Sequence, residues 1–198
     1  MEWKLILQVV GIALGLLYLY LEYKANIWLW VVGIIMPIVH GTLYFKSGLY
    51  ADCSMQVYYI LAGLYGLVAW SRKPSTKTQE DKSRGICQTP AKTWGIIFLL
   101  YVTLHAAIYF ILIKFTDSTV PFWDALTTAL SFIAMWMLAR KYIEQWILWI
   151  AVDTLSVGLY IYKGIYFYAG LYALYAIIAV FGYINWRKIM KNEHNTPL

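Results

Sequence analysis

The sequence predicts an all-α integral membrane protein with seven transmembrane helices, and three observations favour this fold class. First, 62% of the 198 residues are hydrophobic and 13% are charged, whereas soluble domains have about 45–50% apolar and about 25% charged residues. Second, the apolar residues form blocks of nearly the ~20 residues with which an α-helix crosses a bilayer. Third, most basic residues lie between these blocks. A water-soluble fold of this size could not bury so much apolar surface.

Seven apolar blocks follow one another along the chain, at about residues 4–22, 27–45, 53–70, 94–114, 122–139, 143–162 and 165–186. The first block is too long for the apolar core of a signal peptide and has no small-residue cleavage site after it. We therefore expect it to be retained as a helix. The polar segment 71–93 cannot bury enough apolar surface to fold alone, so we expect a cytoplasmic linker there.

The basic residues predict the orientation of the chain. If the N-terminus lies outside, twelve of the 16 lysines and arginines fall in inner segments, and the four outer ones are Lys4, Lys46, Lys114 and Lys163. Because cytoplasmic loops are enriched in lysine and arginine, this distribution predicts an outer N-terminus and a cytoplasmic tail at 187–198. The whole chain, 1–198, is then a single transmembrane domain.

An offset of 116 residues aligns the second and third spans with the sixth and seventh. The identities include Trp30 with Trp146, Leu43 with Leu159, Tyr44 with Tyr160, Gly48 with Gly164, Tyr50 with Tyr166, Tyr59 with Tyr175, Gly66 with Gly182 and Trp70 with Trp186. Aligned spans run in the same direction, so we expect two parallel three-helix repeats, at about 4–70 and 122–186, joined by a connecting helix at 94–114. Such a 3+1+3 duplication is typical of transporters whose substrate site lies near the bilayer midplane.

The sixth span carries the strongest candidate site. Trp146, Trp149, Asp153 and Tyr160 are spaced i, i+3, i+7 and i+14, so they share one helix face. A charged carboxylate near the middle of a span costs ~2.5 kcal/mol or more, so we expect Asp153 to face the bundle interior and to meet a cation. The two indoles can stack on a planar cationic ring. The alternative is that Trp146 is an interfacial residue and that Asp153 hydrogen-bonds a neighbouring helix.

Two further spans carry weaker candidates. In the third span Asp52, Gln56 and Tyr59 share a face. Asp52 lies at the outer end, where a solvated carboxylate is the simpler explanation, and Gln56 is the better contact candidate. In the fifth span Thr127 can bond a ligand, although such hydroxyls more often bond their own helix backbone.

These residues resemble the PnuC family of bacterial vitamin transporters over nearly the whole chain. The similar segments are Gly48–Asp52 with Gln56, Tyr59, Gly66 and Trp70; Asp124 with Thr127, Ser131 and Lys141; and Glu144–Trp149 with Asp153, Leu159, Tyr160, Lys163 and Gly164. The resemblance implies two three-helix repeats joined by a connecting helix, as in the SWEET sugar carriers. It also implies a multi-pass protein of the bacterial inner membrane.

The function that the resemblance implies is facilitated diffusion of an unphosphorylated vitamin, typically nicotinamide riboside, which a cytoplasmic kinase then traps. Related members carry thiamine. By resemblance, Trp146 and Trp149 stack on the ring while Gln56 and nearby polar groups bond the rest. Riboside carriers are expected to have an asparagine near the paired tryptophans. Here Gln145 stands before Trp146, so thiamine has nearly equal standing as the substrate.

Two other functions remain open. A proton-coupled carrier of a sugar or another neutral solute would use Asp153 as its protonation site. An intramembrane enzyme is disfavoured because the chain has no His-Glu-x-x-His run, no Gly-x-Ser-x-Gly elbow and no metal-ligand spacing. We therefore expect no enzymatic activity and no cofactor, and the absence of a Walker motif disfavours ATP-driven pumping. Topology explains the basic residues without a nucleic-acid partner, and a homo-oligomer is compatible with the sequence.

Overall fold

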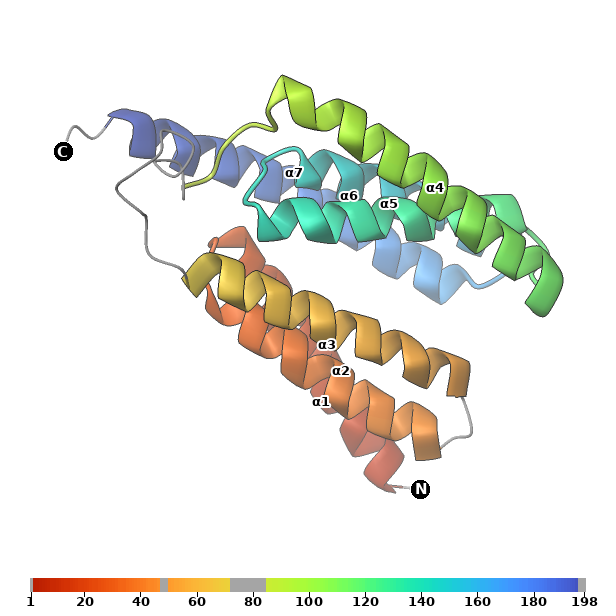
Figure 1. Cartoon of the computed structure of the whole chain (residues 1–198). Helices are drawn as coiled ribbons and strands as arrows, with labels where there is room; N and C mark the ends of the chain where they lie inside the picture. Colours follow the sequence, from red (N-terminus) through yellow and green to blue (C-terminus); the bar gives the residue numbers. More distant parts are fainter. Residues whose placement is uncertain (1, 47–49, 72–84, 196–198) are drawn as a thin grey trace. The chain divides into compact units, whose positions relative to one another are not determined.

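The computed structural model describes residues 2–46, 50–71 and 85–195 (Figure 1). The side chains at 2–9, 12, 43–44, 50–55 and 194–195 lie outside this description. The described residues form seven helices: α1 (Glu2–Tyr23), α2 (Trp28–Lys46), α3 (Tyr50–Ser71), α4 (Ala91–Phe115), α5 (Pro121–Ala139), α6 (Gln145–Tyr162) and α7 (Tyr166–Asn195). The all-helical fold class predicted from the sequence is confirmed.

Helix α7 extends furthest beyond its predicted span, because it continues to Asn195 rather than ending near residue 186. The additional residues include arginine, lysine, methionine and glutamate, which are good helix formers. They continue the helical hydrogen bonding past the apolar part of the sequence. Hydropathy marks only the apolar part, so it underestimates the length of this helix.

Four helices within the described part of the chain are long and apolar enough to cross a membrane, namely α4, α5, α6 and α7 up to Glu193. A shorter apolar helix covers Trp28–Thr42. Helix α4 also exposes large apolar side chains, among them Phe98 and Leu99 at 67% each and Phe110 at 58%. A face of this kind is stable against lipid but not against water. The chain is therefore a multi-pass membrane protein.

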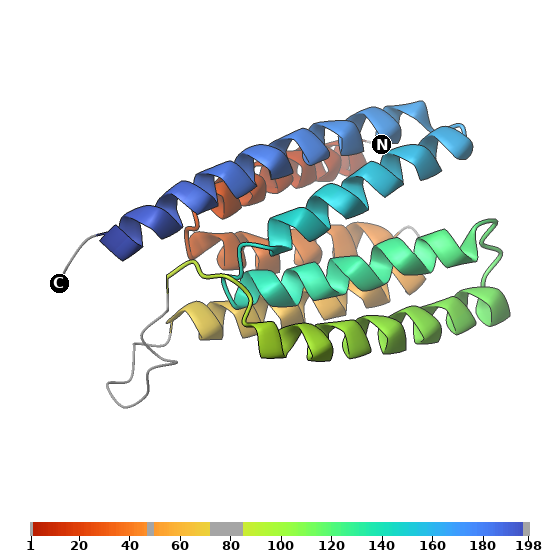
Figure 2. The ribbon, with the colours of Figure 1, turned by 90° about the horizontal axis from the view of Figure 1, so that it is seen from above.

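The chain divides into two compact units, residues 1–84 and residues 85–198. In unit 1, α2 packs against both α1 and α3. In unit 2, each helix packs against the next along the chain, and Figure 2 shows α4 to α7 as a row running from green to blue. Helix α6 therefore lies between α5 and α7.

The same aromatic contact joins α2 to α3 and α6 to α7. Trp30 meets Trp70 edge-on, with ring centroids 5.7 Å apart and planes at 83°. Trp146 meets Trp186 in the same way, at 5.8 Å and 86°. Residues that correspond under the 116-residue offset thus make equivalent contacts in the two units. This equivalence supports a duplicated chain, while the 3+1+3 arrangement in the membrane remains a prediction.

Residues 85–90, which we call the strap, lead into α4 at one end of unit 2. Cys87 forms a parallel β-bridge with Tyr142 in the turn between α5 and α6. The Cys87 N–H donates to the Lys141 carbonyl at 3.1 Å, and the Ile143 N–H donates to the Cys87 carbonyl at 2.9 Å. Lys141 adopts a left-handed conformation with φ of 57°. The strap therefore attaches the start of α4 to the α5–α6 turn.

Candidate functional site

One face of α6 carries buried polar groups along the first half of the helix. Gln145, Trp149 and Asp153 follow one another at four-residue intervals, so each side chain neighbours the next. Gln145 is 0% exposed and Asp153 is 6% exposed, whereas Trp149 is half-buried. The rise of an α-helix separates the first and last of these residues by about 12 Å along the axis. We call these three residues the polar row of α6.

Asp153 is the ninth of the 18 residues of α6 and lies near the middle of the span. In the described part of the chain, no lysine or arginine forms an ion pair with it. Tyr175 of α7 is close enough to interact electrostatically with Asp153. A neutral phenol does not balance a buried negative charge. The carboxyl group therefore requires either a proton or a cationic ligand.

The two tryptophans of α6 have different surroundings. The ring of Trp146 is 1% exposed and packs between α6 and α7 against Gly182 and Trp186. Trp149 is only half-buried. Its indole Nε1 is buried and has no hydrogen-bond partner among the described groups. The indole Nε1 of Trp146 is unpartnered as well, so of the two predicted stacking residues Trp149 is distinguished by its more accessible ring.

Tyr160, the last residue of the predicted stripe, belongs to an aromatic cluster between α6 and α7. Its ring stacks on Tyr168, with centroids 5.4 Å apart and planes at 25°, and on Tyr172 at 5.1 Å and 27°. Tyr172 contacts Tyr175 in turn, at 5.7 Å and 68°. Tyr160 is thus packed among the tyrosines of α7, fifteen residues along α6 from Gln145.

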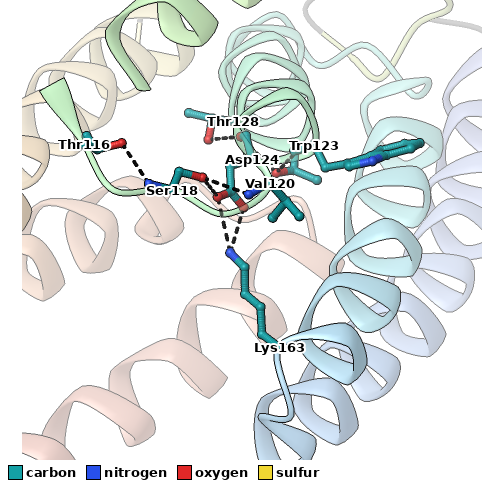
Figure 3. Close-up of polar contacts among 8 residues, drawn as sticks. Thr116, Ser118, Val120, Trp123, Asp124, Thr128 and Lys163 are labelled. Carbon is teal, nitrogen blue, oxygen red and sulfur yellow. Dashed lines mark hydrogen bonds and ion pairs between the residues drawn. The ribbon is translucent and has the colours of Figure 1, made fainter. Parts of the chain in front are cut away.

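The polar groups of α5 make local contacts, and Figure 3 shows those around Asp124. Thr127 Oγ1 donates to the backbone carbonyls of Trp123 and Asp124, at 3.1 and 3.2 Å. Lys163 Nζ lies 3.0 Å from Asp124 Oδ1, and Ser118 Oγ donates to Asp124 Oδ2 at 2.7 Å. The Thr127 hydroxyl is thus engaged with its own helix, as such hydroxyls commonly are.

The predicted residues of the third span belong to unit 1. Gln56 is half-buried and lies against Gly41 of α2. Tyr59 is 36% exposed and contacts Tyr58 edge-on at 5.5 Å. The side chain of Asp52 lies outside the described residues. These residues remain binding candidates from the sequence.

Sequence reasoning missed two parts of this region. Ser156 is 7% exposed on α6, and its position three residues after Asp153 could have revealed it. The rings of Tyr168, Tyr172 and Tyr175 were also missed. The 116-residue offset gives them the positions that Asp52, Gln56 and Tyr59 hold in the first repeat, and this correspondence was the available signal.

Comparison with known proteins confirms the resemblance to the PnuC family. Residues 5–188 match the family described as nicotinamide mononucleotide transporter. The nicotinamide riboside transporter PnuC of Escherichia coli strain K12 is 27% identical, over 91% of this chain and 84% of the relative. That of Neisseria mucosa is 24% identical, over 93% and 73%. The riboflavin/roseoflavin transporter RibM of Streptomyces davaonensis is 27% identical, over 90% and 83%.

A solved structure shares the fold. The crystal structure of the vitamin B3 transporter PnuC covers 94% of this chain and 82% of its own, with a TM-score of 0.70 and 22% sequence identity. This likeness shows the fold of the chain. The relatives in these comparisons are transporters rather than enzymes.

Proposed function

Because the chain belongs to the nicotinamide mononucleotide transporter family, we propose that it mediates facilitated uptake of an unphosphorylated cationic vitamin, with nicotinamide riboside as the first candidate. The chain is a transporter of the bacterial inner membrane and not an enzyme. Several relatives are nicotinamide riboside transporters. Their shared substrate supports this choice.

The observation that carries the proposal is Asp153, a buried carboxyl group near the middle of a membrane span. A substrate with a fixed positive charge on an aromatic ring supplies the missing cation, and Trp149 supplies a π surface beside it. Both nicotinamide riboside and thiamine contain such a ring, so thiamine is the second candidate. Riboflavin, which the relative RibM carries, has a neutral ring system and serves as a contrast.

Other residues have supporting roles in this proposal. Burial of Trp146 against α7 favours a packing role, so we assign ring stacking to Trp149. Gln56, Tyr59 and Asp52 of the third span are proposed to bond the rest of the substrate. We propose that Tyr160 contributes an aromatic surface along the route of the substrate.

The proposed direction of transport is inward, with the N-terminus outside and the C-terminus in the cytoplasm. The excess of lysine and arginine in the predicted inner segments supports this orientation. A cytoplasmic kinase then phosphorylates the vitamin and maintains the gradient.

Single cysteines at Lys191→Cys and Thr119→Cys in a cysteine-free background test the topology. An impermeant maleimide applied to intact cells should label only the second.

Uptake by proteoliposomes tests the substrate. We expect faster uptake of nicotinamide riboside, or of thiamine, than by empty vesicles, and little acceleration of riboflavin. Asp153→Asn removes the charge that binds the ring and should reduce cation uptake by about tenfold or more. Asp117→Asn, which changes an exposed loop carboxylate, is the matched control. Failure of the wild-type protein to accelerate either cationic vitamin would refute the proposal.

Tryptophan fluorescence tests the location of the site. Saturable quenching by the substrate should disappear in Trp149→Phe if its indole stacks on the bound ring. Trp123→Phe is the control, because Trp123 is 45% exposed on α5. Equal quenching in both variants would move the site away from Trp149.

A proton-coupled carrier of a neutral solute is the alternative, and the same buried Asp153 favours it. In that case an imposed pH gradient drives uptake, and Asp153→Asn abolishes the response to the gradient. If uptake of the solute is unaffected both by the gradient and by Asp153→Asn, proton coupling is excluded.

A further inference from the structure

We propose that Gln145 and Trp149 form a hydrogen-bonding edge that recognises a neutral primary carboxamide on the transported ring. This inference rests on the proposed function, since it names the substrate group that Gln145 and Trp149 bind. It adds a basis for specificity to the binding of the ring charge by Asp153.

The amide of Gln145 is buried without any partner in the described part of the chain. The side chain is 0% exposed, and neither Oε1 nor Nε2 forms a hydrogen bond there. The indole Nε1 of Trp149, one turn further along α6, is in the same situation. Buried polar groups are almost always satisfied, and leaving one unsatisfied is costly. Three orphaned atoms on neighbouring side chains therefore suggest a ligand that completes them.

Comparison of the two repeats indicates that the unpartnered groups of Gln145 and Trp149 are not required for packing. Under the 116-residue offset, Gln145 corresponds to Leu29, which is also 0% exposed. The fold thus needs only a bulky apolar side chain at this position, and the amide of Gln145 is additional. By contrast, the orphaned Nε1 of Trp146 has a counterpart in the orphaned Nε1 of Trp30. That pair belongs to the shared packing, whereas the orphaned atoms of Gln145 and Trp149 occur in one repeat only.

The chemistry of the edge selects the ligand. A glutamine amide offers both donors and an acceptor, whereas an indole Nε1 only donates. A primary carboxamide matches this set, because its carbonyl accepts while its amino group donates in the same plane. A carboxylate can only accept, so it leaves the Gln145 Oε1 unpaired and adds a negative charge two helical turns from Asp153. The edge should therefore favour a ring amide over the corresponding ring acid.

The order of the polar row fits this assignment. Trp149 lies between Gln145 and Asp153 at four-residue intervals, so a ring stacked on its indole has the amide on one side and the carboxylate on the other. A pyridinium with a carboxamide substituent presents its cationic nitrogen and its amide at different positions of one ring. Gln145 can then bind the carboxamide while Asp153 contacts the cationic ring.

The test uses Gln145→Leu, which installs the residue of the equivalent position in unit 1, and Gln145→Met as a second apolar variant. Binding of nicotinamide riboside and of nicotinic acid riboside is measured by fluorescence and by competition with uptake. We expect the dissociation constant of the amide to rise by about tenfold or more, with a small change for the acid. In the absence of ligand, both variants should be at least as thermally stable as the wild type, because each substitution removes two unpaired polar atoms. Gln88→Leu, at an exposed strap residue, is the control.

The outcomes separate this inference from the proposed function. If the wild-type protein transports the riboside and both variants bind it with unchanged affinity, this inference alone is overturned. It is also overturned if the variants are less stable and lose affinity for both ligands equally, because Gln145 then has a structural role. If the wild-type protein binds and transports no riboside, the proposed function fails as well.

Discussion

A Cβ atom added to Gly182 would lie 2.6 Å from the ring of Trp146, closer than real Cβ atoms come to a neighbour. The indole therefore rests directly on the backbone of α7, and this contact explains why its ring is 1% exposed. Gly66 makes the same close approach to Trp30 in unit 1. The size of Trp146 and the absence of a side chain at Gly182 together set the spacing between α6 and α7.

Gly182→Ala should destabilise the protein through this contact. The added methyl group must displace either a rigid indole or the helix backbone, and overpacking of this kind costs about 1–3 kcal/mol. We expect a lower thermal unfolding midpoint in detergent. The comparison is Gly170→Ala on the same helix, where an added Cβ meets nothing within 4 Å. Alanine has the higher helix propensity, so an equal loss of stability in both variants would contradict the packing argument.

The sequence predicted the helices well because their apolar lengths are set by the bilayer. Six predicted spans match α1 to α6 within a few residues. The offset of 116 residues aligned Trp30 with Trp146 and Trp70 with Trp186, and the structure shows that the two tryptophans of each unit contact each other. Glycine and tryptophan persist in both repeats because close helix contacts require them. Hydropathy could not predict the strap, because it is held by backbone hydrogen bonds and by the polar side chain of Glu144 rather than by apolar packing.

The candidate site was only partly predictable. The spacing of Trp149 and Asp153 placed them on one face, but spacing alone does not say which residues of a face meet a neighbouring helix. Trp146 was grouped with them, although its ring packs against α7. Gln145 was singled out by a family resemblance, and only its burial revealed an amide without a partner.

The ion pair between Asp124 and Lys163 should contribute little to stability. Their side chains are 26% and 29% exposed, so solvent and salt screen the attraction. A double-mutant cycle with Asp124→Asn and Lys163→Met should give a coupling free energy below about 1 kcal/mol that falls with added salt. A large coupling that is insensitive to salt would mean that the pair is shielded from water.

Glu144→Ala should weaken the attachment of the strap to the turn between α5 and α6. Glu144 Oε2 accepts both the N–H of Thr89, at 2.9 Å, and its hydroxyl, at 2.7 Å. Thr89 is 7% exposed, so loss of the carboxylate leaves two buried donors unpaired at a cost of about 1–3 kcal/mol. Hydrogen exchange measured by mass spectrometry should become faster at residues 86–89. Gln88→Ala, in the same segment, should leave that protection unchanged, and unaltered exchange in Glu144→Ala would contradict the assignment.

The position of Cys87 in the strap places its thiol near charged groups that change its pKa. Burial raises the pKa of its thiol, the carboxylates of Glu144 and Glu193 raise it further, and the ammonium group of Lys141 opposes them. The folded protein therefore keeps the thiol proton at a pH where the unfolded chain has begun to lose it. The contribution of the Cys87 thiol to the free energy of unfolding is therefore fully present below the pKa of the unfolded chain. It is lost as the pH rises through the pKa of the folded protein.

Alkylation of Cys87 by iodoacetamide should therefore be slower in the folded protein than in the denatured chain at about pH 8, because the thiolate is the nucleophile. The difference should narrow as the pH rises. A Cys53→Ala background leaves Cys87 as the one reacting thiol. Lys141→Gln removes the only one of these charges that lowers the pKa, so it should slow alkylation further at the same pH. Faster alkylation in Lys141→Gln would show that the lysine limits access of the reagent rather than favouring the thiolate.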